Sequence, residues 1–141
     1  MGIYQSGGRT RSIVNVANPG GAGGSAYVFA TSSLSEPTLA TDGYANYGIQ
    51  ENLHLMIDND SNETSKFVVW TYHSFSGIWG KLNIFDGTNG LNDVITIQVA
   101  AGINHHVIAK IAGAERVYIQ CYVYPNTPSG NTTVYLGVNT I

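Results

Sequence analysis

The sequence predicts an all-β protein, built as a single β-sandwich of about eight strands that resembles a jelly roll. Short runs of β-branched and aromatic residues recur roughly every ten residues between turn signals. In addition, no stretch predicts an amphipathic helix: Ile103, Val107 and Ile111 recur at helical spacing, but glycines bracket them and β-branched residues disfavour a helix. With 141 residues the chain is long enough for one domain, which we place at residues 25–141, after a glycine-rich arm at residues 1–24.

The arm is predicted from composition, because seven of its 24 residues are glycine and such a segment cannot pack a core of its own. It still contains a strand candidate, since Ile13, Val14 and Val16 stand in a short alternating run. We expect the arm to be flexible alone and to add this strand to the open sheet edge of a neighbouring molecule. Arg9 and Arg11 would then pair with acids of that neighbour. A frayed terminus is the alternative.

A β-hairpin at residues 65–86 is expected to organise the domain, because it holds both tryptophans and three of the four phenylalanines. Residues 66–73 are rich in β-branched and aromatic side chains, which favour a strand. Residues 74–77, S-F-S-G, indicate a turn, and residues 78–85 predict the second strand. One face of the hairpin suits a sandwich core, whereas the other is too apolar for ordinary solvent-facing surface.

The remaining strands follow at similar intervals. They are predicted at residues 26–31, 52–58, 93–99, 105–111, 116–124 and 132–138, with a short additional candidate near 38–41. The run 52–58 illustrates the pattern: Leu53, Leu55 and Ile57 point one way, while His54 and Met56 point the other.

Charge is scarce: charged residues make up 11% of the chain, against about 25% in a typical soluble domain. Either much of the surface faces other proteins, or neutral polar residues coat it. The first 35 residues carry two bases and no acid, whereas the rest carries nine acids and four bases, a balance of −5. Because phosphate binding needs a basic face, we expect no nucleic-acid partner.

The number of cysteines and the search for targeting signals give further information about the compartment. Cys121 is the single cysteine, which excludes an intrachain disulfide, so nothing requires an oxidising compartment. The chain opens with no signal peptide, and no apolar run approaches the roughly 20 residues of a membrane helix. We therefore expect synthesis in the cytoplasm and no membrane partner.

Metal sites are not predicted. The four histidines are His54, His73, His105 and His106, and the last two, as neighbours on one strand, point to opposite faces. No pair is expected to converge, so we predict no metal and no other cofactor.

A second metal-site candidate is the run D-N-D-S-N-E at residues 58–63, which matches the first ligand positions of an EF-hand loop. It lacks the glycine and the final glutamate of that motif. We interpret it as a polar turn, with a surface cation on Asp58 and Asp60 as the alternative.

Catalytic residues are not predicted either. The serines lie in glycine- and asparagine-rich turns rather than on a strand–helix elbow, and most acids lie in turns rather than in pairs. We therefore expect a protein that is not an enzyme.

Aromatic residues are the remaining functional signal, because exposed aromatic rows either stack on sugar rings or anchor protein interfaces. Two rows are possible: Trp70, Tyr72 and Trp79, or Tyr118, Tyr122 and Tyr124, although Trp70 also suits the core. The interface candidates that we select are Arg9, Arg11, Ile13, Val14, Val16, Phe75, Trp79, Tyr122, Tyr124 and Tyr135.

The chain resembles the cement or decoration proteins of tailed-bacteriophage capsids, which are small jelly-roll proteins that clamp the shell. Three stretches carry the resemblance: the glycine-rich run 20–24, the strand W-G-K-L at 79–82 that leads to D-G at 86–87, and I-A-G-A-E-R-V-Y at 111–118. The likeness is one of general style over the whole chain.

The resemblance implies a non-enzymatic structural virion protein, located on the capsid surface, that binds and stabilises the shell. Its partners would be the major capsid protein and further copies of itself, as trimers or at symmetry axes. The alternative is a carbohydrate- or receptor-binding β-sandwich module.

Overall fold

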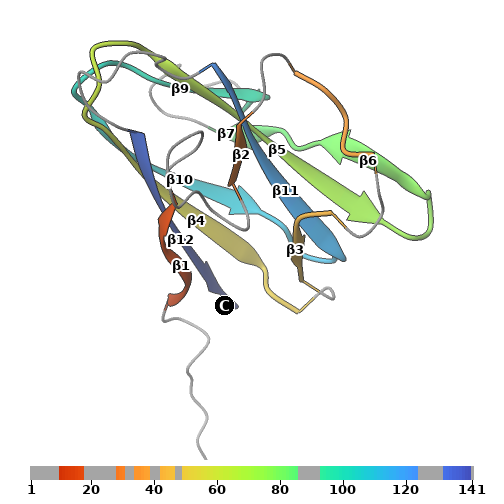
Figure 1. Ribbon diagram of the computed structural model, residues 1–141. Coiled ribbons are helices and arrows are strands. Elements are labelled where there is room, and N and C mark those ends of the chain that lie inside the picture. The colour runs from red at the N-terminus through yellow and green to blue at the C-terminus, as the bar shows by residue number, and fades with distance from the viewer. Residues whose placement is uncertain are drawn as a thin grey trace, which may run out of the picture.

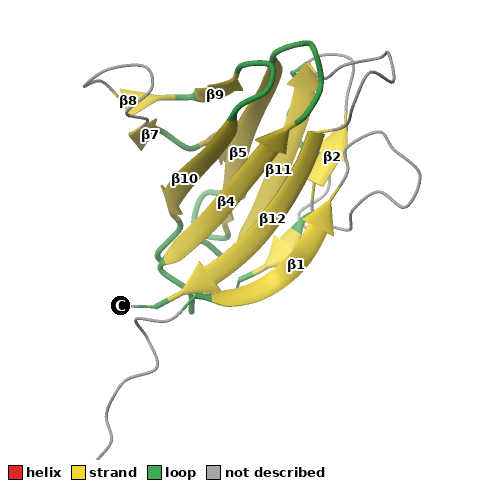
Figure 2. Ribbon diagram, turned by 90° about the vertical axis from the view of Figure 1, so that its left-hand side faces the viewer, coloured by secondary structure: helices red, strands yellow, loops and turns green. Residues whose placement is uncertain are grey.

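The computed structural model describes residues 10–17, 28–30, 34–38, 42–46, 49–85, 93–123 and 132–140. Within these residues the protein consists of strands and turns, with no helix. Two sheets pack face to face, as Figures 1 and 2 show. The predicted all-β sandwich is therefore confirmed.

The first sheet contains four antiparallel strands, which lie side by side at the front of Figure 2. In spatial order they are β1 (Arg11–Ala17), β12 (Thr132–Asn139), β4 (Asn52–Asn59) and β10 (Asn104–Lys110).

The second sheet is built on two long strands, β5 (Ser65–His73) and β11 (Arg116–Val123), which pair antiparallel. Its remaining strands are β2 (Val28–Ala30), β3 (Tyr44–Ala45), β6 (Ile78–Lys81) and β9 (Thr96–Val99). Strands β2 and β3 pair with β11, while β6 and β9 pair with β5. Two further short strands, β7 (Ile84–Phe85) and β8 (Asp93–Val94), pair with each other.

The strand order of the two sheets is that of a jelly roll. One sheet runs β1-β12-β4-β10 and the other β2-β11-β5-β6, so the first and last strands are neighbours. One departure is that β2 runs parallel to β11, whereas every other pair in the described structure is antiparallel.

The core between the sheets follows from the alternation of side chains along the strands. On β4, Leu53, Leu55 and Ile57 are buried, as predicted, and they pack with residues such as Phe67 and Ile119 of the opposite sheet. Cys121 also belongs to this core, and burial raises the pKa of its thiol to about 12. It is therefore a packing residue rather than a reactive thiol.

The predicted second strand of the hairpin is divided, because one edge of β5 serves two partners. Strand β6 pairs with the half of β5 at 70–73, and β9 pairs with the half at 65–68. Between them the N–H of Leu82 donates to the carbonyl oxygen of Val69 at 2.8 Å, and the chain then leaves the edge. The predicted runs 78–85 and 93–99 are accordingly each two short strands.

The N-terminal strand pairs within its own chain, whereas we expected it to pair with a neighbouring molecule. Residues 11–17 form β1, which pairs with β12 of the same chain, so the sheet edge that they cover is their own rather than a neighbour's. Ile13 packs against the core between the sheets. The physical reason is that β12 offers an unpaired edge within the molecule, at no cost in association entropy. Residues 1–9 and 18–24 of the expected arm lie outside the described residues.

Candidate functional site

A second apolar cluster lies on the outer face of the β5–β11 sheet. It consists of Val68, Trp70 and Trp79, and the exposed fractions of the two indoles are 5% and 6%. The predicted aromatic row therefore exists, but it is covered rather than open. Leu34, from the segment at residues 34–37, packs against the cluster, as do Tyr72 and Tyr118.

Gln120 holds that covering segment in place. Its side chain accepts a hydrogen bond from the indole N–H of Trp70 at 3.1 Å and donates one to the carbonyl oxygen of Ser35 at 3.0 Å. The segment that Gln120 holds contributes Leu34, which shields the cluster from solvent. Trp79, which we expected at an interface, is buried within the chain.

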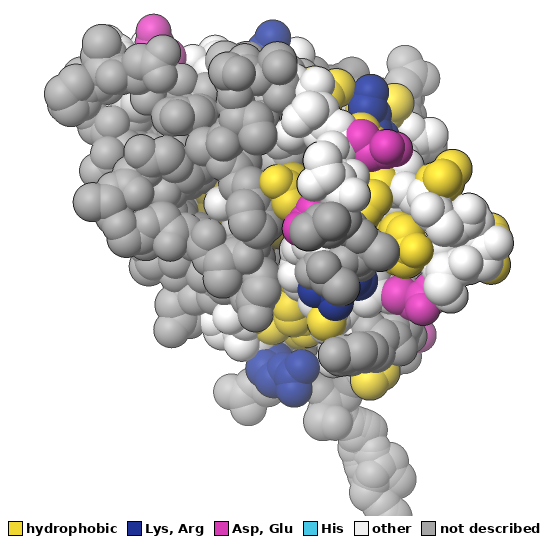
Figure 3. Space-filling model, turned by 45° about the vertical axis from the view of Figure 1, so that its right-hand side comes forward, with side chains coloured by type: hydrophobic (Ala, Val, Ile, Leu, Met, Phe, Trp, Pro, Cys, Tyr) yellow, Lys and Arg dark blue, Asp and Glu magenta, His cyan; other side chains and the backbone are white. Residues whose placement is uncertain are grey.

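The tip of the β5–β6 hairpin remains open. Phe75 in its turn is 87% exposed and Ile78, the first residue of β6, is 65% exposed. Figure 3 shows hydrophobic side chains at the surface on the side of the molecule that carries this hairpin, among polar and charged ones. The turn itself is ordered: the N–H groups of Ser76 and Gly77 both donate to the carbonyl oxygen of His73, and Gly77 has a positive φ of 71°.

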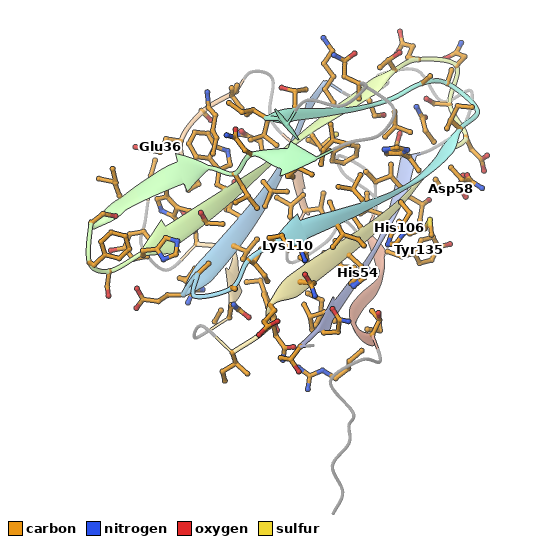
Figure 4. All side chains as sticks on the ribbon, turned by 180° about the vertical axis from the view of Figure 1, so that it is seen from behind. Glu36, His54, Asp58, His106, Lys110 and Tyr135 are labelled. Atoms are coloured by element: carbon orange, nitrogen blue, oxygen red, sulfur yellow. The ribbon has the colours of Figure 1, made fainter. Side chains whose placement is uncertain are left out.

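A pocket of about 420 Å³ opens on the outer face of the other sheet. Its lining comes from β1, β4, β10 and β12 and from the residue before β1: Thr10, Ser12, His54, Met56, His106, Tyr135, Leu136 and Gly137. Figure 4 shows His54, His106 and Tyr135 close together over these strands.

The pairing of β4 with its neighbours β10 and β12 brings the residues of this pocket together. The even-numbered residues of β4 point outward, and Met56 lies directly between Tyr135 of β12 and His106 of β10. Gly137 lies opposite His54 and has no side chain, and a Cβ built on it would collide with the side chain of Thr10. The absence of a side chain at residue 137 therefore leaves room for the pocket next to His54.

The two histidines form a pair. Nδ1 of His54 lies 3.0 Å from Nε2 of His106, and the rings are nearly parallel, at 12°, with centroids 5.3 Å apart. Nε2 of His54 lies 3.1 Å from Oδ1 of Asn139, which is a hydrogen-bond acceptor. Nε2 of His54 therefore carries the proton, Nδ1 carries a lone pair, and Nε2–H of His106 donates to it.

Burial and nearby charges favour the neutral form of His106. Burial lowers the pKa of His106 below its ordinary value of 6.5, and the nearby charges of His54 and His105 lower it further. Near neutral pH the ring of His106 is consequently uncharged.

Sequence reasoning missed this pair. It correctly separated His105 from His106, because adjacent strand residues point to opposite faces. It also expected that no other two histidines would come together. However, His54 and His106, which are 52 residues apart, meet because β4 and β10 are neighbouring strands. The alternation of β4 does predict an outward His54, but nothing local in the sequence indicates which strand lies beside it.

The other interface candidates are placed as follows. Arg11 is exposed on β1, and Tyr135, 42% exposed, lines the pocket. The strands β1 and β11 include Val14, Val16 and Tyr122, but the structure does not describe the side chains of these three residues. Two further candidates, Arg9 and Tyr124, lie outside the described residues.

The D-N-D-S-N-E run forms a polar turn organised by Asn59, which is fully buried. Nδ2 of Asn59 donates to the carbonyl oxygens of Glu63 at 2.8 Å and Val99 at 3.0 Å, and its Oδ1 accepts from the N–H of Ser61. Over the described ranges, no group of three or more His, Cys, Asp or Glu side chains gathers as a metal-ion cluster. Nor do those ranges contain a helix long and apolar enough to cross a membrane.

The protein is a β-sandwich with the strand order of a jelly roll. One sheet carries an apolar hairpin tip, and the outer face of the other sheet carries a pocket that contains two histidines. Comparison of the chain with protein-family models, with curated proteins and with solved structures found no match.

Proposed function

We propose that the chain is a structural virion protein, without catalytic activity, that binds and stabilises a viral capsid shell. The observation that carries the proposal is the hairpin tip, where Phe75 and Ile78 are 87% and 65% exposed on an ordered two-stranded projection. Large apolar side chains exposed near each other in the chain, on an ordered hairpin, favour an interaction surface.

Two further features support a protein shell as the partner. Jelly rolls are a common architecture among viral capsid proteins. The low charged fraction of 11% suits a surface that faces other proteins, since charged residues are depleted at the centres of interfaces. The partners in this proposal are the major capsid protein and further copies of the chain itself.

The test is cosedimentation of the purified chain with empty shells assembled from the coat protein encoded beside its gene. Wild-type protein should pellet at a fixed ratio to the coat subunits. Replacing Phe75 and Ile78 together by serine should weaken the attachment at least about tenfold, because a central apolar anchor carries much of the energy of an interface.

The control is Ile49→Ser, which removes one isoleucine, 63% exposed against 65% for Ile78, from outside the hairpin. It should leave attachment unchanged. A gene neighbourhood without coat, portal or maturation-protease genes would overturn the proposal, as would full occupancy by the hairpin double variant.

A second candidate function is binding of a carbohydrate in the pocket on the outer face of the β1-β12-β4-β10 sheet. Tyr135, 42% exposed, offers a ring for stacking on a sugar, and the hydroxyl-bearing residues Thr10 and Ser12 line the same pocket. Screening against immobilised glycans tests this function. Tyr135→Ala should abolish binding, whereas the Phe75 and Ile78 double variant should retain it, and the two functions are thereby distinguished.

A further inference from the structure

We propose that His54 and His106 form an acid-sensitive switch on the outer face of the β1-β12-β4-β10 sheet. The two rings stay hydrogen-bonded to each other while one of them is neutral, and they separate when both are protonated. The inference goes beyond both proposed functions, because neither gives this pair a role. The switch needs no ligand, and only its consequence for carbohydrate binding rests on the second candidate function.

The number of protons that the contact can hold carries the proposal. Nδ1 of His54 and Nε2 of His106 face each other at 3.0 Å, which is the length of a hydrogen bond with one proton between the two nitrogens. One of the two nitrogens must therefore keep a lone pair. If both carried a proton, two N–H groups on two positively charged rings would point at each other, and the contact would break.

Asn139 occupies the other nitrogen of His54. Its Oδ1 lies 3.1 Å from Nε2 of His54, so that nitrogen keeps its proton in every state of the pair. The first added proton goes to Nδ1 of His106, the one ring nitrogen outside these two contacts, and the bond between the rings survives. The second proton can only go to Nδ1 of His54, which accepts that bond, so the second proton separates the rings.

The surroundings place the second step at acidic pH. Burial lowers the pKa of His106 below its ordinary value of 6.5, and the charges of His54 and His105 lower it further, so the pair gains its second charge below pH 6.5. The charged and titratable side chains nearest the pair lie on three strands of the sheet: Asp58 on β4, His105 and Lys110 on β10, and Tyr135 on β12. Asp58 favours protonation of the pair, whereas Lys110 opposes it.

Separation of the rings changes the pocket that they line. Among the described residues of the lining there is no acid, lysine or arginine, so the two imidazoles supply its positive charge. His54 is half-buried and His106 is exposed, so both rings can turn toward solvent. Breaking the pair gives the pocket of about 420 Å³ two positive charges, which favour an anionic ligand over a neutral sugar.

The test is nuclear magnetic resonance of the full chain, with the histidine ring nitrogens followed from pH 7.5 to pH 4.5. We expect His54 and His106 to titrate together in two steps, at least about one pH unit apart. Contacts between the two rings should vanish in the second step and not in the first. Signals of Met56 and Tyr135 should shift with that second step, while the dispersed amide signal of Leu55 shows that the sandwich stays folded.

Single substitutions uncouple the two rings. In His54→Gln and in His106→Gln the remaining ring should titrate in one step, and His106 should do so at a higher pH than in the wild type, because the charge of His54 is gone. His105→Gln is the matched control, since it removes a smaller influence on His106 and should raise its pKa less. His73→Gln should leave both rings unchanged.

The outcomes separate the switch from the second candidate function. Independent one-step titrations of the two rings in the wild type would overturn the switch, as would a ring contact that persists when both are protonated. Equal effects of His54→Gln and His105→Gln on His106 would do the same. Glycan binding at pH 7.5 should be lost across the second step, whereas the absence of glycan binding at pH 7.5 counts against the carbohydrate function alone.

Discussion

The indole N–H of Trp70 donates a hydrogen bond to Oε1 of Gln120 at 3.1 Å, and both side chains are buried on the outer face of the β5–β11 sheet. The same glutamine holds Ser35, so one side chain joins an aromatic cluster to the segment that covers it. We therefore predict that Gln120→Leu destabilises the protein by about 1–3 kcal/mol, because the indole N–H loses its buried acceptor.

Urea unfolding followed by tryptophan fluorescence measures this change. Gln98→Leu is the control, because Gln98 is exposed on β9 and should shift the free energy of unfolding by less than about 0.5 kcal/mol. Equal effects of the two substitutions would contradict the role given to Gln120.

Two glycines with positive φ should respond differently to alanine. Gly43 has φ of 78°, and a Cβ built on it would overlap the carbonyl oxygen of Val117, whereas Gly77 has φ of 71° and open space around it. Gly77→Ala should cost about 1–2 kcal/mol, the strain of a left-handed conformation. Gly43→Ala should cost more, because the contact between β3 and β11 must also open. Thermal unfolding of both variants checks the order, and a larger effect at Gly77 would contradict it.

Neighbouring residues on β4 provide a paired test of the sandwich. Leu55 is fully buried in the core, so Leu55→Ala should lower the free energy of unfolding by about 2–5 kcal/mol. Met56, the next residue, is 42% exposed on the opposite face, and Met56→Ala should cost less than about 1 kcal/mol. Denaturant titrations of the two variants measure the difference, which a one-residue shift of register would reverse.

Stability should fall on mild acidification, in part through His106. Because its pKa in the folded protein lies below 6.5, the contribution to stability is complete above pH 6.5 and is lost as the pH falls through the lowered pKa. The charged and titratable residues around it are His54 and Asp58 on β4, His105 and Lys110 on β10, and Tyr135 on β12. His106 is largely exposed, so the loss is partial.

The measurement compares the midpoint of urea unfolding at pH 7.5 and pH 5 for wild type and His106→Gln. The variant should lose less stability over this interval than the wild type does. Identical pH dependence of the two proteins would show that His106 does not contribute.

Several features of the fold follow from local sequence. Turn residues and runs of β-branched and aromatic residues predict the β-sandwich and the hairpin around Gly77, since each depends on residues close together in the chain. The broken strand after Lys81 could not be predicted, because it results from β6 and β9 competing for one edge of β5.

The sequence by itself determined which face of each strand is apolar: Leu55 points inward and His54 outward because side-chain direction alternates along any strand. Only the tertiary structure decided what each outward face meets. Ser35 reaches Gln120 across 85 residues, and His54 reaches His106 across 52. No local pattern encodes such pairs, because strand order results from the packing of the whole chain, and the pocket on the outer face of the β1-β12-β4-β10 sheet depends on that order.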